Sequence, residues 1–313
     1  MPIEILTNKT QDKKNQRWIN VSNAKKKEIE YLKKNFNFNL KNLSASFAHT
    51  YSQRTQIEKY PKYLFIILRF PVLDKEKQEI IVSEIDCFVS KNYLITIHDS
   101  NLKELVSLFK LCKKDKASLK FYLGKDPIFL LHKILDRSLN QCFATLDYLN
   151  IEISKVEEKI FSGNQRESID DILIIKHNIV NFRRTMQSHR NLLKKLSNNH
   201  NKYVKKEHTA DYCNLIQSTV DIWNTIENQK EMVEALEYTN DSMLSYRMGD
   251  IMKTLTIFSV IMFPLTLLAA IFGMNTIKGM PFVETEGGFW IIMVIMTIGI
   301  LGMFGCFKRK GWI

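Results

Sequence analysis

Two long apolar stretches near the C-terminus constrain this chain more than any other feature. They cover residues 251–272 and 289–307 and are separated by a short polar loop. Each has about the 20 residues that a helix needs to cross ~30 Å of hydrocarbon, and a spanning helix satisfies its own backbone hydrogen bonds. The sequence therefore predicts a two-helix transmembrane hairpin. Because two spans cannot enclose a pore, such a chain can conduct ions only as an oligomer.

Composition narrows the class of the remaining chain and of its partners. The 313 residues are 45% hydrophobic and carry a formal charge of +12. A basic surplus can indicate nucleic-acid binding, but the lysines are scattered among acidic residues and no aromatic-rich platform for a single strand is present. We therefore expect no nucleic-acid partner. The five cysteines are far apart, which favours reduced thiols in a cytosolic domain over a disulfide framework.

Basic residues near the two spans predict the orientation of the hairpin. Arg247 and Lys253 lie near the start of the first span, and a basic tail follows the second, whereas the loop between them has only Lys278. The N-terminal segment lacks the apolar core of a signal peptide. By the positive-inside rule, both termini are expected in the cytoplasm.

Before the first span, the sequence predicts an α/β domain. Three apolar runs, 63–70, 79–89 and 93–97, have the length and the β-branched content of buried strands. The first run is bounded by Pro61 and Pro71, and the Lys91-Asn92 pair favours a turn between the other two. Helices are expected at about 102–112 and from Pro127 onward. The expected architecture is a sheet covered by helices on both faces.

Beyond Pro127 the chain predicts long helices, because leucine, isoleucine, lysine and glutamate recur at helical spacing. They should extend to about residue 161, over 168–196, and from about 205 into the membrane as one stalk of roughly 65 residues. The predicted order is a cytosolic α/β domain (1–126), a cytosolic helical region (127–204), the cytosolic part of the stalk helix (205–250), transmembrane helix 1 (251–273), an outward loop (274–288), transmembrane helix 2 (289–307) and a basic cytosolic tail (308–313).

A short motif stands at the end of the first span. Its residues are Gly273-Met274-Asn275, and Phe263-Pro264-Leu265-Thr266 precedes them within the span. Further matching segments are 252–256, 280–281 and 308–312. With the G-M-N motif in this position, the chain resembles the CorA-type magnesium channel family, which consists of two-transmembrane G-M-N metal ion transporters. The resemblance is close over the hairpin and loose over the order of the domains.

The resemblance implies a homopentameric funnel in which the first span of each copy lines the pore. The implied function is influx of divalent metal cations, chiefly Mg²⁺ and also Co²⁺ and Ni²⁺, driven by the membrane potential and gated by intracellular Mg²⁺. Mg²⁺ is then both the transported and the regulatory ion, and no other cofactor is implied. The implied partners are further copies of the chain, these cations and the lipid of the plasma (inner) membrane.

The resemblance makes Asn275 the first candidate for ion selection. Mg²⁺ gives up its waters reluctantly, so a ring of Asn275 amide oxygens, joined by the backbone carbonyl of Gly273, would accept hydrogen bonds from the hydrated ion. We expect Gly273 to permit a helix-ending turn with positive φ. The alternative role for Asn275 is an ordinary C-terminal helix cap.

Helical spacing places a set of residues on one face of the first span. By spacing alone such a stripe would usually be a packing surface, whereas the resemblance implies that it lines the pore. The level of Met252 and Leu255 would then form an apolar constriction that gates by dewetting. The family usually has Asn where Gly249 stands, so a polar ring is missing at that level. The stripe consists of Gly249, Met252, Leu255, Ser259, Phe263, Thr266 and Ala270.

Charged residues on either side of the hairpin are expected to act electrostatically. Glu284 and Glu286 in the outward loop would raise the local cation concentration, although a solvated loop would have the same composition. The resemblance implies a basic collar at Lys308, Arg309 and Lys310, which would act in gating or anchor the topology.

The resemblance also implies regulatory Mg²⁺ sites between neighbouring cytosolic domains. The candidate ligands are Asp74 and Glu76 after the first predicted strand, opposite Asp211 or Asp221 on the stalk. The chain departs from the family pattern here, because Asn214 stands where an acidic ligand would be expected.

Enzymatic activity is not expected, because the sequence lacks the nucleotide-binding, metallopeptidase and hydrolase motifs and its histidines have no zinc-ligand spacing. Two alternatives to a magnesium channel remain. One is the zinc-transporting branch of the same superfamily, which often has a different residue in place of Met274. The other is a non-transporting, membrane-anchored helical scaffold, in which Asn275 would tolerate substitution.

Overall fold

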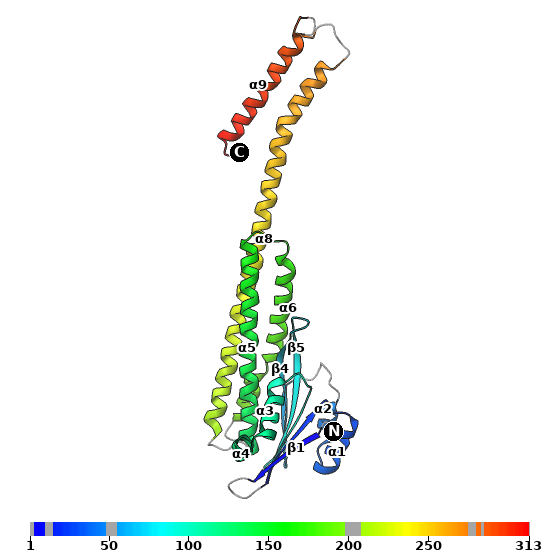
Figure 1. The fold of residues 1–313 in the computed structure, drawn as a ribbon, viewed down its shortest axis with the longest axis vertical. Coiled ribbons are helices and arrows are strands. Elements are labelled where there is room, and N and C mark those ends of the chain that lie inside the picture. The colour runs from blue at the N-terminus through cyan, green and yellow to red at the C-terminus, as the bar shows by residue number, and fades with distance from the viewer. Residues whose placement is uncertain are drawn as a thin grey trace. The chain divides into compact units, whose positions relative to one another are not determined.

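The computed structural model describes residues 3–9, 15–47, 55–197, 208–274, 280–282 and 285–312. The chain forms two compact units, Met1–Glu237 and Tyr238–Ile313. The long helix α8 (Thr209–Phe272) contributes to both units. Figure 1 shows the chain coloured from the N-terminus to the C-terminus.

The first unit is built on a mixed sheet of six strands in the order β1-β2-β6-β5-β4-β3. β2 and β6 are parallel, and the other neighbouring pairs are antiparallel. The middle of the sheet is apolar, and the first five residues of β4 are all buried. The strands are β1 (Ile3–Lys9), β2 (Asn15–Ser22), β3 (Gln56–Lys59), β4 (Leu64–Asp74), β5 (Glu79–Val89) and β6 (Tyr93–His98).

Two short helices cover one face of the sheet, α1 (Lys26–Phe36) and α2 (Leu40–Phe47). Leu32 of α1 and Leu43 of α2 join a buried apolar cluster with Phe65 and Phe88 of the sheet. Phe38, between the two helices, stacks on Phe88 with 4.3 Å between ring centroids. Aromatic pairing thus adds to the apolar burial that holds α1 and α2 on the sheet.

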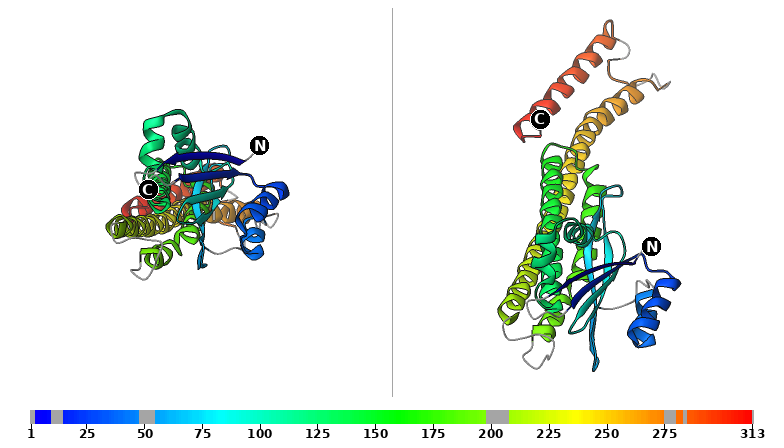
Figure 2. Two further views of the ribbon diagram at one scale, coloured as in Figure 1. Left: turned by 90° about the horizontal axis from the view of Figure 1, so that it is seen from below. Right: turned by 60° about the horizontal axis from the view of Figure 1, so that its bottom comes forward.

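Among the described residues, five further helices cover the opposite face, so the expectation of helices on both faces is confirmed (Figure 2). They are α3 (Lys103–Lys114), α4 (Lys116–Leu123), α5 (Pro127–Phe161), α6 (Ser168–Met186) and α7 (His189–Ser197). Trp18 of β2 meets Phe109 of α3 edge to face at 4.9 Å. α5 begins where expected, because Asp126 caps it by accepting from Phe129 N at 2.9 Å and Pro127 takes the first helical position.

Within the first unit, α8 packs against α5 and α6. The contacts combine buried hydrogen bonds with ion pairs along about seven helical turns. They are Tyr212 Oη to Ile128 O at 3.2 Å, Gln229 Nε2 to Leu146 O at 2.8 Å, Arg183 to Glu227 at 2.6 Å, and Lys176 to Glu237 at 2.8 Å.

The second unit consists of the rest of α8 and helix α9 (Gly288–Arg309). The apolar window of α8 has a mean hydropathy of 2.4 with 6% of its residues buried, and that of α9 has 2.3 with none buried. Phe263 is 74% exposed and Trp290 is 70% exposed. The predicted pair of long apolar helices is confirmed.

Several elements differ from those expected from the sequence. β4 continues through Pro71 to Asp74, because β3 pairs only with Leu64 to Ile67 and the proline lies beyond its end. The helix expected over 168–196 is interrupted between α6 and α7, where His189 turns into the core beside Phe70. β1, β2, β3, α1, α2 and α4 were not predicted. The expected start of the stalk near residue 205 lies outside the described residues.

A buried acid should make the first unit less stable at alkaline pH. Asp86 is 2% exposed under α2, and burial, followed by the charge of Glu84, raises its pKa from 3.8 to about 8, although Ser46 and Arg69 act in the opposite direction. The folded chain therefore holds a proton that the unfolded chain releases, so stability falls as pH rises from about 4 to about 8.

Between pH 6 and pH 8 the unfolding free energy of the unaltered protein should fall by about 2 kcal/mol because of Asp86. We expect this fall to be absent in Asp86→Asn. Thermal unfolding of the full-length protein in detergent at both pH values measures it, with exposed Glu79→Gln on the same strand as the control. An unchanged pH dependence in Asp86→Asn would contradict the assignment.

Candidate ion-conduction site

The predicted pore-lining residues all lie on α8 in one exposed stripe. Met252 is 55% exposed, Leu255 is 56% exposed and Phe263 is 74% exposed, while Ser259 is half-buried. Residues three and four apart on a helix share a face, and the structure brings the stripe together as expected. Gly249, Thr266 and Ala270 are exposed as well. Whether the stripe lines a pore remains a prediction.

The hydroxyl groups of the stripe are satisfied within α8. Ser259 Oγ donates to Leu255 O at 2.9 Å, and Thr266 Oγ1 donates to Met262 O at 2.9 Å. Each hydroxyl oxygen keeps lone pairs that can accept a hydrogen bond from a water molecule. The stripe therefore offers two acceptor levels, at 259 and 266, between apolar levels. Apart from the adjoining backbone of α8, no atom of the described residues lies within 4 Å of the point where a side chain at Gly249 would begin.

The G-M-N motif begins where α8 ends. Gly273 N donates to Ala269 O at 2.9 Å, and Met274 N donates to Ile271 O at 3.2 Å, so the last turn tightens. The expected positive φ at Gly273 is wrong, because Gly273 is not among the residues with positive φ. Glycine suits this position because it has no side chain: a Cβ at residue 273 would lie 3.2 Å from Ala269 O, a tight contact. Asn275 lies outside the described residues.

The charged residues on either side of the hairpin are exposed where they are described. Glu286 is exposed in the loop before α9, and Glu284 lies outside the described residues. Lys308 and Arg309 occupy the last turn of α9, and Lys310 ends the helix by donating from its backbone to Cys306 O at 3.1 Å. Cations in the last turn of a helix are stabilised by its dipole. The proposed collar is thus compatible with a simple helix-ending role.

Aromatic side chains mark both ends of α9. Phe289 and Trp290 meet edge to face at 5.6 Å, and Trp312 stacks on Phe307 at 5.8 Å. Tryptophan is enriched where a membrane meets water, because its ring is apolar and its N–H is polar. The placement of these rings therefore supports the membrane assignment made from length and hydropathy.

The regulatory candidates do not meet within one chain. Asp74 caps the β4–β5 turn by accepting from Glu76 N at 3.0 Å. That turn lies beside Tyr148 of α5, whereas Asp211 O accepts from His132 Nε2, about 24 Å away along the same helix. Among the residues that the structure describes, no group of three or more carboxylate, histidine or cysteine side chains could hold a metal ion. These ligands remain a prediction for neighbouring copies.

Asn178 of α6 holds the β4–β5 turn in place, and sequence reasoning missed it. Its side chain is 2% exposed, accepts from Ile80 N at 2.8 Å and donates to Gln78 O at 2.9 Å. A single polar residue on the buried face of α6 gives no signal of such a contact. These two hydrogen bonds, the Asn178 clamp, fix the turn that carries the two acidic candidates, Asp74 and Glu76.

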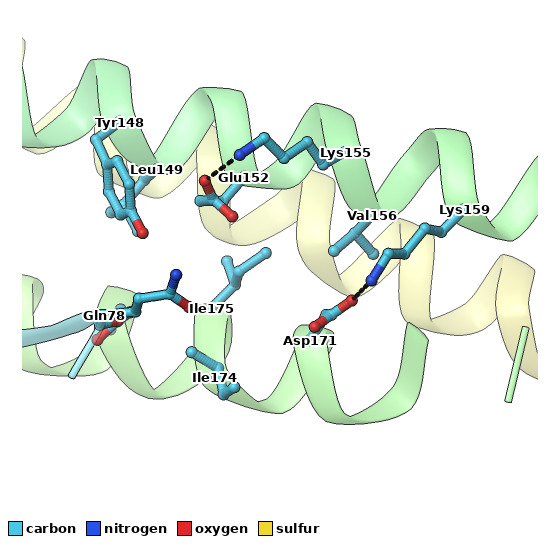
Figure 3. Close-up of a pocket in the computed structure, with 11 residues that line it drawn as sticks. Gln78, Tyr148, Leu149, Glu152, Lys155, Val156, Lys159, Asp171, Ile174 and Ile175 are labelled. Carbon is cyan, nitrogen blue, oxygen red and sulfur yellow. Dashed lines mark hydrogen bonds and ion pairs between the residues drawn. The ribbon is translucent and has the colours of Figure 1, made fainter. Parts of the chain in front are cut away.

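A small cavity lies beside this turn, between α5 and α6 (Figure 3). Lys155 pairs with Glu152 at 2.8 Å, and Lys159 pairs with Asp171 across the two helices at 2.6 Å. Because the two lysines and the two acids form pairs, the cavity has no surplus charge for an ion. Its ion pairs instead connect α5 to α6 next to the clamp.

Comparison with known proteins decides the family. The CorA-like Mg²⁺ transporter protein family matches residues 13–309. The chain belongs to this family. Cobalt/magnesium transport protein CorA from Methanocaldococcus jannaschii is 25% identical over 296 residues, which cover 95% of this chain and 91% of that protein. The protein of the same description from Thermotoga maritima is 24% identical over 296 residues, covering 95% of this chain and 83% of its own length.

The solved structures bear out the CorA-like fold. The complete CorA magnesium transporter from M. jannaschii superposes with a TM-score of 0.83 at 24% identity, covering 95% of this chain and 92% of that one. The ZntB cytoplasmic domain from Vibrio parahaemolyticus gives 0.57 at 14% identity, covering 74% of this chain and 88% of that one. At these identities the likeness concerns the fold alone. The CorA-like architecture therefore agrees with the expected α/β domain, long helix and second apolar helix.

We expect Asn178→Ala to destabilise the first unit by about 2 kcal/mol, because it leaves the buried Ile80 N–H without its acceptor. Hydrogen exchange of the full-length protein should show faster exchange at the Ile80 amide. Asn181→Ala is the matched control, since the Asn181 side chain contacts Ile80 O at 3.3 Å and His177 Nε2 at 2.9 Å but not Ile80 N, and is less buried. Equal acceleration of that amide in both variants would contradict the clamp.

Proposed function

We propose that this protein is a divalent metal cation channel that admits chiefly Mg²⁺, with Co²⁺ and Ni²⁺ as further ions. The observation that carries the proposal is the exposed stripe of α8 that ends at the G-M-N motif in a CorA-like chain. The proteins from M. jannaschii and T. maritima are described as cobalt/magnesium transport proteins, which supports the same class of ion. The activity is transport rather than catalysis.

Selection would act on the hydrated ion. Mg²⁺ demands octahedral coordination and loses its waters slowly, so a rapid channel gains by binding the hydration shell instead of the bare ion. In an assembly of several copies, Asn275 amide oxygens and Gly273 carbonyls would form a ring of acceptors at the outer end of α8. Met274 is 56% exposed in the single chain, so it is available to contact a neighbouring copy or lipid.

The membrane potential would drive influx without ATP. Moving one elementary charge across 100 mV is worth about 2.3 kcal/mol, so a divalent cation gains about 4.6 kcal/mol. Glu284 and Glu286 would raise the cation concentration at the entrance, an effect that salt weakens. Both termini would lie in the cytoplasm, with the basic collar at the inner surface of the plasma (inner) membrane.

The gate would be the apolar level of Met252 and Leu255. Both side chains are more than half exposed in one chain, so copies of α8 could bring them together around an axis. A narrow apolar passage excludes water and therefore a hydrated ion. Gly249 supplies no polar side chain below this level, so the proposed gate depends on these two residues.

Cytosolic Mg²⁺ would close the channel by bridging acidic residues of neighbouring copies. Asp74 and Glu76 on the clamped β4–β5 turn would face Asp211 or Asp221 of the next copy. Carboxylates brought together repel, and a shared cation removes the repulsion. Loss of the ion would then loosen the contact between copies.

Asn275→Ala should reduce Mg²⁺ uptake into liposomes by at least about tenfold, because it removes an amide oxygen that accepts from the waters of the hydrated cation at the pore mouth. The oligomer should stay assembled. Asn275→Asp should retain binding and slow release, since a ring of carboxylates holds a divalent ion more tightly. Exposed Asn150→Ala on α5 serves as the control for loss of an asparagine. Unreduced Mg²⁺ uptake by Asn275→Ala would favour the helix-cap role, whereas absence of uptake by the unaltered protein would favour the non-transporting scaffold.

A further inference from the structure

Basic and aromatic side chains gather where α4 ends and α5 begins. Phe121 of α4 is 54% exposed, and its ring meets Phe129 of α5 edge to face at 5.7 Å. Lys125 Nζ lies 4.3 Å from the centroid of the Phe129 ring, and Lys133 Nζ lies 5.6 Å from it. Both ammonium groups thus lie near the same ring, beside an exposed aromatic surface.

Two arginines extend this group of cations. Arg137 follows Lys133 by one helical turn, and its Nη2 donates to Tyr122 Oη at 3.1 Å. Exposed Arg17 at the start of β2 lines a small cavity together with Tyr122 and Lys125. The basic–aromatic patch consists of Arg17, Phe121, Tyr122, Lys125, Lys133 and Arg137.

Nearby acidic side chains are largely engaged elsewhere. Asp126 accepts from Phe129 N at 2.9 Å and lies 3.0 Å from His208 Nε2. Asp115 caps α4 by accepting from Ala117 N and Ser118 N. Within the part of the chain that the structure describes, the four cations of the patch form no ion pair with a carboxylate. Their charge is therefore available to an anion from solution.

An unsatisfied buried group lines the same cavity. Gln16 is 6% exposed, and its Nε2 donates to Lys91 O at 3.2 Å. Its Oε1 is buried and finds no hydrogen-bond partner among the described residues. Buried acceptors are rarely left unpaired, and this small cavity has room for one water molecule at most.

We propose that the basic–aromatic patch binds a nucleoside polyphosphate. Phosphate oxygens would accept charge-assisted hydrogen bonds from Lys125, Lys133 and the arginines. The base would stack on the exposed ring of Phe121, as bases do on aromatic side chains. A single bridging water would donate to Gln16 Oε1. This site is separate from the stripe of α8, and its occupancy does not depend on transport.

The extent of the patch favours a small ligand over a nucleic acid. Along α5 it extends from the level of the Phe129 ring, which Lys125 and Lys133 approach, to Arg137, a rise of about 12 Å. Single-stranded nucleic acids are bound along grooves that accommodate about 4–16 nucleotides and present several stacking platforms. The patch offers one exposed aromatic ring, Phe121, next to one cluster of cations, which matches a single base joined to a chain of phosphates.

Calorimetric titration of the full-length protein with ATP tests the proposal, in uncharged detergent and Mg²⁺-free buffer so that ATP does not act by removing Mg²⁺. The variant Lys125→Gln/Lys133→Gln keeps both side chains polar, shortens each by one atom and removes two charges. It should weaken ATP binding by at least about tenfold. Lys26→Gln/Lys27→Gln on α1, where both lysines are exposed, makes the same change in net charge and should alter affinity less than about twofold.

Two further titrations separate the parts of the ligand. Phe121→Ser should weaken binding of ATP and leave binding of inorganic tripolyphosphate unchanged. The proposal is overturned if ATP does not bind, if both double variants lose affinity equally, or if Phe121→Ser has no effect on ATP. It is also overturned if an oligonucleotide or soluble dihexanoyl-phosphatidylglycerol binds the patch more tightly than ATP.

Discussion

The apolar side chains of α8 and α9 in the second unit are almost all exposed within one chain. Lipid or further copies of the chain must therefore cover them, and the proposed pore depends on this exposure. Only Leu265 and Gly288 are buried among the described residues of this unit's two apolar segments. Each helix satisfies its own backbone, so no further strand or helix is needed for hydrogen bonding. Lipid can cover side chains on one side of α8. In the proposed assembly, the stripe from Gly249 to Ala270, with its two hydroxyl levels, would face water and other copies.

The first unit fixes α8 by a different set of forces. Tyr212 and Gln229 donate to backbone carbonyls of α5, and Glu237 pairs with Lys176 of α6. The ion pair is more than one third exposed, so it contributes little by itself. The buried hydrogen bonds and the burial of Leu215, Ile222 and Ile226 of α8 therefore contribute most to the attachment of α8. The Asn178 clamp connects α6, which also pairs with α8, to the β4–β5 turn. This turn carries the acidic candidates for regulation.

Sequence reasoning found the elements whose signal is local and strong. The strands β4, β5 and β6, the start of α5 at Pro127 and the two apolar helices were predicted, because apolar runs and caps determine them directly. β1 was not predicted because it is an edge strand whose side chains are mostly exposed, so it lacks a clear alternation. The break between α6 and α7 contains neither glycine nor proline. It arises because His189 packs against Phe70, a contact that only the folded chain creates.

The candidate site was predictable only in part for the same reason. The stripe on α8 follows from helical spacing, and the motif at its end follows from a resemblance. The role of Gly273 was misjudged, since space beside Ala269 O explains the glycine better than its φ does. The Asn178 clamp and the basic–aromatic patch combine residues far apart in sequence. Asn178 contacts Ile80, and Arg17 lies near Lys125 only because β2 and α4 are neighbours in the fold.

The central claim is that several copies of α8 share one pore, because one chain cannot enclose it. Native mass spectrometry of the full-length protein, released from detergent, tests this claim most directly. The account predicts a single dominant species with the mass of five chains. A dominant monomer under conditions that keep the first unit folded would contradict it.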